Sequence, residues 1–139
     1  MATILKISEA TSLALHAMVY IAAYGIQPIS TAKLAKELDA SAAHLSKVMQ
    51  RLTHIGLLKS HRGPSGGFLL TKPANKITLL EIYEAIEGPM PDSTCLFDKT
   101  VPVCTGKNCV LSELIKNVHN EVKKYLNKTT IDKQSIAFK

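Results

Sequence analysis

The chain has 139 residues, of which 46% are hydrophobic and 20% charged, values that fit a globular domain and exclude disorder as the default. The formal net charge of +6 favours polyanionic partners, chiefly nucleic acid or an anionic membrane surface. The apolar stretch at 13–26 is shorter than the roughly 20 residues of a membrane span, contains His16 and lacks a typical cleavage site. We therefore expect a cytoplasmic protein that neither spans nor binds a membrane.

Helix start and stop signals recur along the first two thirds of the chain. Ser30 and Ser41 are good N-cap residues, and Gly56 stops a helix as a C-cap glycine does. Thr78 and Glu81 have the spacing of a capping box. The expected helices cover residues 8–23, 31–38, 41–55 and 78–87.

A two-stranded hairpin is expected between the third and fourth helices. Residues 57–61 and 68–71 are its strands, and the glycine-rich segment 62–67 is its turn. Two short helices joined by a tight turn and followed by such a hairpin predict a winged helix-turn-helix.

The C-terminal third has a different character. Residues 89–109 form a long loop that contains three prolines and all three cysteines, and 110–127 has helical periodicity. In that helix, a spacing of 4-3-4-3 is typical of a coiled-coil seam and predicts a homodimer through residues 110–128. The seam residues are Leu111, Ile115, Val118, Val122 and Tyr125.

The expected fold class is therefore mainly α: a winged helix-turn-helix with a two-stranded wing and a long C-terminal dimerisation helix. The expected division is a DNA-binding domain over 1–88, a cysteine-containing sensor loop over 89–109, a dimerisation helix over 110–128 and a mobile tail over 129–139.

The helix over 41–55 is the candidate reading helix. Small residues lead its N-terminal end, and Lys47 and Gln50 can bond base edges or phosphates. The turn that follows begins with Arg62, and arginine favours a narrow minor groove. The alternatives are an ordinary helical hairpin with a solvated polar face and a plain β-turn.

The three cysteines follow the pattern Cys95-x8-Cys104-x4-Cys109. In a reducing cytosol, such a group is more often metal-binding or redox-active than a disulfide framework. Structural zinc sites favour closer pairs and four protein ligands, so an iron–sulfur cluster with a fourth ligand from elsewhere fits better. Three unligated thiols and a reversible disulfide switch are the alternatives. His16 and His119 are candidate fourth ligands between which the spacing does not choose.

The stretch 56–70 resembles the recurrent wing of the IscR/NsrR-like family of winged helix-turn-helix iron–sulfur and redox regulators, and the resemblance extends over 6–126. It implies a dimer on a pseudo-palindromic operator in double-stranded DNA, with the helix over 41–55 in the major groove and Arg62 in the minor groove. The expected DNA contacts are Lys6, Ser30, Ser41, Ala43, His44, Lys47, Gln50, Arg51, Arg62, Gly63, Ser65 and Gly66.

The same resemblance places Cys95, Cys104 and Cys109 at the cluster ligands. In some members, helix 1 of the opposite subunit supplies a further ligand, and Ser12 and His16 fall there in this chain. We take His16 as the fourth ligand and favour [2Fe–2S] over [4Fe–4S], because histidine ligation recurs on the former. The cysteine gaps differ from the family's more even spacing, so no relative's ligand set transfers whole.

The expected function is that of a dimeric transcriptional regulator, not an enzyme, that senses redox, iron or nitric oxide status through the cluster. A cluster-free thiol/disulfide switch on the same scaffold is the main alternative. A redox enzyme or metal-delivery protein is disfavoured, because no nucleophile–base pair or cofactor loop occurs in the sequence. An adaptor that binds an acidic protein partner is a further alternative.

Overall fold

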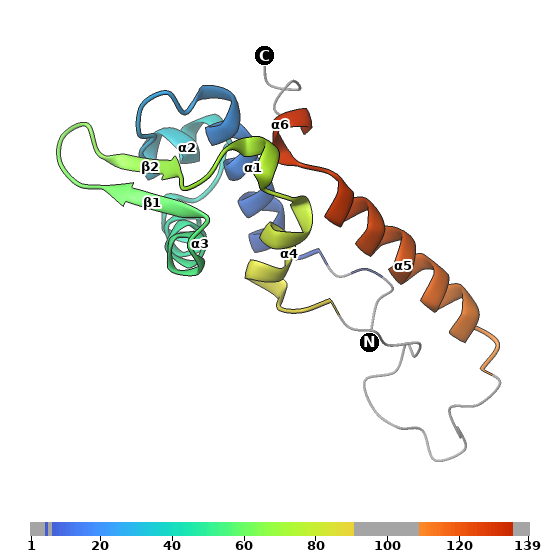
Figure 1. Cartoon of the computed structure of the whole chain (residues 1–139). Coiled ribbons are helices and arrows are strands. Elements are labelled where there is room, and N and C mark those ends of the chain that lie inside the picture. The colour runs from blue at the N-terminus through green and yellow to red at the C-terminus, as the bar shows by residue number, and fades with distance from the viewer. Residues whose placement is uncertain (1–4, 6, 91–108, 135–139) are drawn as a thin grey trace.

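The structure is a computed structural model that describes residue 5 and residues 7–90 and 109–134 (Figure 1). Its elements in chain order are α1 (Glu9–Tyr24), α2 (Thr31–Glu37), α3 (Ala42–Ile55), β1 (Leu58–His61), β2 (Gly67–Leu70), the 3-10 helix η1 (Ala74–Lys76), α4 (Leu79–Glu87), α5 (Ser112–Lys128) and α6 (Ile131–Gln134). Most of the described chain is helical, and its one sheet is the two-stranded antiparallel hairpin of β1 and β2. The predicted fold class is confirmed.

The helix starts follow from local side-chain chemistry. Ser30 and Ser41 have extended backbones, and each hydroxyl accepts a hydrogen bond from the backbone N–H three residues ahead. The capping box of α4 is complete, because the Glu81 carboxylate also accepts from the Thr78 N–H at 3.1 Å. Gly56 ends α3 in the left-handed conformation, with φ of +96°.

Helix α1 lies inside the fold and packs against α3, α4 and α6. Four apolar residues of α3 are buried and recur every three or four positions, which is why this helix presents one apolar face to α1 and α4. They are Leu45, Val48, Met49 and Leu52. The opposite face of α3 is free to carry function.

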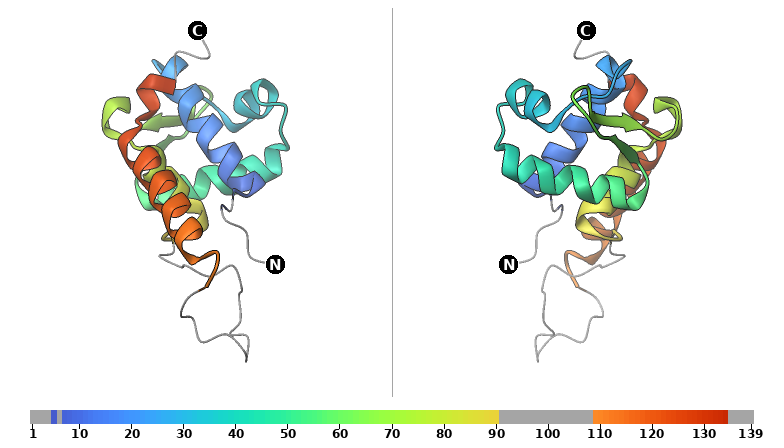
Figure 2. Two further views of the ribbon diagram at one scale, coloured as in Figure 1. Left: turned by 90° about the vertical axis from the view of Figure 1, so that its right-hand side faces the viewer. Right: turned by 90° about the vertical axis from the view of Figure 1, so that its left-hand side faces the viewer.

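The wing is joined to the helix-turn-helix by main-chain hydrogen bonds. Strand β1 pairs with β2 from Leu58↔Leu70 to His61↔Gly67. Ile29, just before α2, forms an antiparallel bridge with Phe68, with N···O distances of 3.1 and 2.9 Å. The wing therefore has a fixed orientation beside α2 and α3, and α5 lies on the other side of the molecule (Figure 2).

The C-terminal segment corrects one prediction. Residues 129–139 were expected to be a mobile tail, but the structure forms helix α6 within them and buries Ile131 completely. The Leu79 N–H donates to the Thr129 carbonyl at 3.0 Å, and the Ile131 N–H donates to the Ile77 carbonyl at 3.1 Å. One apolar residue gives no helical pattern in the sequence. The packing of α6 on the core therefore arises from tertiary contacts and could not be predicted from periodicity.

Helix α5 agrees with the predicted seam only in part. Ile115 is 1% exposed, so its own subunit already buries it, whereas Tyr125 is 58% exposed. Leu114, outside the predicted seam, is 51% exposed. None of the described helices is long and apolar enough to span a bilayer.

Candidate nucleic-acid interface

A stripe of exposed side chains runs along α3, opposite its buried face. Ala43, Lys47, Gln50 and His54 are all exposed, and their spacing of four, three and four places them on one side of the helix. The leading residue is small, and the next two have long polar side chains. Such a surface can approach a groove closely at its N-terminal end and reach base edges or phosphates further along.

The N-termini of α2 and α3 add hydrogen-bond donors. Ser30 accepts from the Lys33 N–H and Ser41 accepts from the His44 N–H, which leaves both hydroxyl hydrogens free for an outside acceptor. Helix N-termini also carry partial positive charge, which favours phosphate groups. Both caps thus have the chemistry of backbone-positioning contacts.

The turn of the wing is narrow because two of its positions require glycine. A Cβ on Gly66 would lie 2.3 Å from the His61 carbonyl oxygen, and Gly63 has φ of +111°. Arg62 and Ser65 are exposed on this turn. A turn without bulky side chains and with an exposed guanidinium can enter a groove without steric conflict.

Charge is distributed very unevenly along the chain. No Asp or Glu occurs between Asp39 and Glu81, whereas six of the 17 basic residues lie there and the other 11 equal the 11 acidic residues in number. The six are Lys47, Arg51, Lys59, Arg62, Lys72 and Lys76. The net charge of +6 therefore arises in residues 40–80, and four of these six cations lie in α3 and the wing.

Four of these cations are exposed and available to a ligand. Within the part of the chain that the structure describes, no ion pair to an acidic residue is made by Lys47, Lys59, Arg62 or Lys76. The sequence-based contact set omits Lys59, and a segment-by-segment charge count is the signal that identifies it. Lys6, another predicted contact, lies outside the described residues.

Two of the predicted DNA contacts also touch other helices of the same subunit. Arg51 is exposed, and its Nε donates to the Ala85 carbonyl of α4 at 2.9 Å, so the side chain also makes a contact inside the subunit. His44 lies 3.9 Å from a carboxylate oxygen of Glu9 in α1. Both lie on the flank of α3 that faces α1 and α4, which periodicity alone does not distinguish from the groove-facing side.

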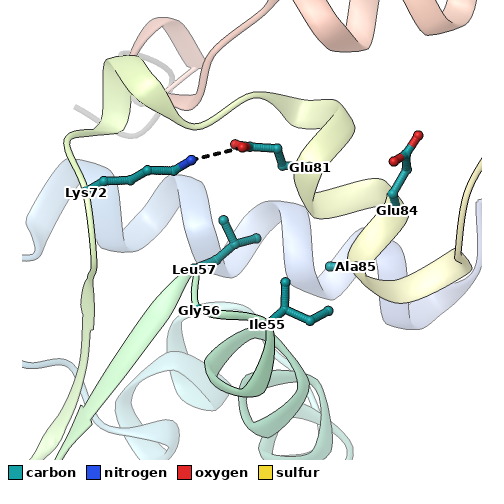
Figure 3. Close-up of a pocket in the computed structure, with 7 residues that line it drawn as sticks. All are labelled: Ile55, Gly56, Leu57, Lys72, Glu81, Glu84 and Ala85. Carbon is teal, nitrogen blue, oxygen red and sulfur yellow. Dashed lines mark hydrogen bonds and ion pairs between the residues drawn. The ribbon is translucent and has the colours of Figure 1, made fainter.

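A pocket of about 450 Å³ opens behind the C-terminal end of α3 (Figure 3). Its lining residues are Ile55, Gly56, Leu57, Lys72, Glu81, Glu84 and Ala85. The Lys72 ammonium donates to Glu81 at 2.9 Å across its rim, and Figure 3 shows the Glu84 carboxylate directed away from that pair. Because its main opposite charges already neutralise each other, we assign this pocket no ligand.

The predicted cluster ligands are described only in part. Cys95 and Cys104 lie outside the described residues, and Cys109 is exposed just before α5. His16 is exposed on α1, and its Nδ1 lies 2.7 Å from the Ser12 carbonyl oxygen. No group of three or more His, Cys, Asp or Glu residues comes together among the described residues.

The helix-turn-helix, the hairpin beside it and the basic segment that forms them define a protein of the winged helix-turn-helix class. A family model named Rrf2 and described as an iron-dependent transcriptional regulator matches residues 7–134. The chain belongs to the Rrf2 family, which confirms the resemblance to IscR/NsrR-like regulators.

Individual relatives agree with this assignment. The chain is 27% identical over 128 residues to the protein aau3 of Rhizobium meliloti, covering 92% of this chain and 83% of the relative. It is 28% identical to the transcriptional regulator IscR of Pectobacterium atrosepticum, covering 76% of this chain and 63% of IscR. The structure of CymR, the global cysteine regulator of B. subtilis, superposes with a TM-score of 0.80 at 28% identity and covers 96% of this chain and 98% of CymR. The family's regulators are not enzymes, as predicted for this chain.

Proposed function

We propose that this Rrf2-family regulator binds a pseudo-palindromic operator in double-stranded DNA as a homodimer, and that the state of its three cysteines sets its affinity. The observation that carries the DNA-binding part is that the segment forming α3 and the wing contains basic residues and no acidic ones. In this proposal α3 enters the major groove with Ala43, Lys47 and Gln50. Arg62, Gly63, Ser65 and Gly66 of the wing follow the adjacent minor groove.

The proposed dimer forms through residues 110–128. Leu114 and Tyr125 leave about half of their surface exposed in the single subunit, and Leu111 is 40% exposed. Large apolar side chains in a line along one helix are suited to pairing with a second copy. Two reading helices held in this way would match half-sites about 34 Å apart, one DNA turn.

The proposed sensor is an iron–sulfur cluster held by Cys95, Cys104 and Cys109, with His16 of the opposite subunit as fourth ligand and [2Fe–2S] favoured. Thiolates and imidazole are suitable ligands for such a cluster. The contact of the His16 Nδ1 with the Ser12 carbonyl supports this role, because it leaves Nε2 as the acceptor on an exposed side chain. When bound, the cluster supplies a group that responds to oxidation, iron supply or nitric oxide.

A cluster-free thiol switch is the second candidate. Cys109 is an exposed free thiol, and an exposed thiol can be oxidised and form a disulfide with another cysteine of the segment. This candidate needs no histidine ligand, so it predicts that His16 substitution has no effect on sensing.

One preparation distinguishes the two candidates. Protein purified without air is analysed for visible absorbance, iron and acid-labile sulfide, beside Cys104→Ala and His16→Ala variants. Stoichiometric iron and sulfide that are lost in Cys104→Ala support the cluster, and a changed spectrum in His16→Ala supports the fourth ligand. Colourless wild-type protein that reconstitution leaves colourless overturns the cluster and leaves the thiol switch.

A further inference from the structure

The last turn of α4 holds the flank of the reading helix. The Arg51 Nε on α3 donates to the Ala85 carbonyl at 2.9 Å. The final carbonyls of a helix have no partner within the helix, and a cation at this end is favoured by the helix dipole. Arg51 therefore satisfies α4 as a C-terminal cap while it fixes the distance between α3 and α4.

The same turn holds the start of α1. One carboxylate oxygen of Glu87 accepts from the Ser8 N–H at 2.9 Å and from the Thr11 hydroxyl at 2.5 Å. In an ordinary capping box, a Glu or Gln three residues beyond the cap accepts the bond from the cap N–H. Here that position is Thr11, and a carboxylate from another helix performs the task. Thr11 is fully buried, so this polar contact is shielded from water.

The start of α1, which Glu87 caps, also lies beside the start of α3. Glu9, the first residue of α1, lies 3.9 Å from His44 in the first turn of α3. That pair is exposed and therefore weak, but it places the N-terminal end of α3 against the helix that Glu87 caps. Burial and the nearby Glu87 carboxylate also raise the pKa of Tyr83, one turn earlier in α4.

The chain continues from this turn toward the cysteines. Gly88 ends α4 with φ of +86°, and Met90 is 7% exposed. The chain therefore remains anchored in the protein interior up to the last residue described before Cys95. A displacement of the cysteine-containing segment would act first on Met90 and through it on Glu87 and Ala85, which lie three and five residues earlier.

We propose that the last turn of α4 is the joint through which the cysteine segment acts on the reading helix, with Arg51 and Glu87 as its positioning residues. This inference extends the proposed function and depends on it. In one state of the three cysteines, the turn holds α3 through Arg51 and α1 through Glu87. In the other state, one or both of these hydrogen bonds change, and the position of α3 changes with them. Neither side chain needs to touch DNA.

The test measures a ratio of affinities. Anisotropy titrations use a duplex of about 30 base pairs, long enough for two half-sites one turn apart, selected in vitro by the wild-type protein from a random pool. Each protein is titrated as purified without air and again after oxidation with air and diamide. A coupling of ordinary size changes the wild-type dissociation constant about 5- to 150-fold between the two states.

In Arg51→Met and Glu87→Ala, the dissociation constants of the two states should differ by less than about twofold. This is below the roughly fivefold lower end of ordinary coupling, so loss of coupling can be distinguished from its presence. Glu87→Gln keeps an acceptor oxygen and should retain more of the ratio than Glu87→Ala. Lys72→Met removes one positive charge, as Arg51→Met does, but acts at the first turn of α4, where Lys72 pairs with Glu81. It should therefore keep the wild-type ratio.

The possible outcomes test the role of the last turn of α4 separately from the proposed sensing by the three cysteines. A wild-type ratio of one overturns the sensing function itself. A normal wild-type ratio that persists in Arg51→Met and Glu87→Ala overturns the joint alone. If Arg51→Met instead weakens both states equally and lowers the salt slope by about 1, Arg51 contacts a phosphate and the joint is wrong. Should Arg51→Met fail to unfold cooperatively on heating, the Glu87→Ala and Glu87→Gln pair decides.

Discussion

The backbone of Ile29 occupies the space that a side chain on Gly67 would need. A Cβ on Gly67 would lie 2.4 Å from both the carbonyl carbon and the carbonyl oxygen of Ile29, and Gly67 has φ of +157°. The next residue, Phe68, exchanges two main-chain hydrogen bonds with Ile29. The wing thus owes its position beside α2 to a glycine whose lack of a side chain permits the contact.

Gly67→Ala should move the wing away from α2. Because the new methyl group would meet backbone that cannot rotate away, the free energy of unfolding should fall by more than about 1 kcal/mol. Ser65→Ala, on the exposed turn, should change it by less than about 0.5 kcal/mol. Urea unfolding measures both, and equal stability of the two variants would contradict the close packing of Gly67 on Ile29.

Lys47→Ala and Arg62→Ala should each weaken binding to DNA of any sequence. If each substitution removes one phosphate contact, the slope of log K against log salt should fall by about 1. Anisotropy titrations between about 50 and 200 mM salt measure this slope. Lys133→Ala, which removes an exposed lysine from α6, is the matched control and should leave the slope unchanged. Unchanged affinity in both test variants would rule out the docking of α3 and the wing on DNA.

Ile131→Ala should destabilise the fold although Ile131 lies near the C-terminus. Ile131 is completely buried, and truncation of such a residue to alanine costs about 2–5 kcal/mol. Ile26→Ala makes the same chemical change at a side chain that is 91% exposed and should cost less than about 0.5 kcal/mol. Chemical denaturation compares them, and a cost as small as that of Ile26→Ala would show that α6 does not dock on the core.

Tyr125→Glu should separate the dimer into monomers. It places a charge in the exposed apolar line of α5, where burial against a second copy would leave the carboxylate unpaired. Asn120→Glu adds the same charge on the opposite side of the helix and should leave the dimer intact. Sedimentation velocity distinguishes the two, and a Tyr125→Glu dimer would show that subunits associate through another surface.

The sequence was sufficient wherever structure is decided locally. The N-caps Ser30 and Ser41, the capping box of Thr78 and Glu81 and the stop at Gly56 depend on hydrogen bonds within one or two turns. The charge of the reading face can likewise be read from the sequence, because it needs only a count of residues along the chain.

Contacts between distant elements were beyond sequence reasoning. Arg51 is a residue type that commonly contacts DNA, yet its Nε donates a hydrogen bond to the Ala85 carbonyl, 34 residues away. Glu87 accepts a hydrogen bond from Ser8, the N-cap of α1, 79 residues earlier in the chain. Ile115 fits the predicted seam by spacing but is buried within its own subunit. Periodicity identifies a helical face, and only the fold decides which neighbour covers it.

The uneven distribution of charge has a consequence for the encounter with DNA. Since all of the net charge arises in residues 40–80 and the remaining basic and acidic residues balance in number, the excess positive charge of each subunit lies in the segment that forms α3, the wing and η1. The electric field of the DNA phosphates should orient the protein before the two molecules come into contact. At 0.1 M salt this field extends about 10 Å, the Debye length. A protein with the same charge spread evenly would be attracted as strongly but would arrive in random orientations.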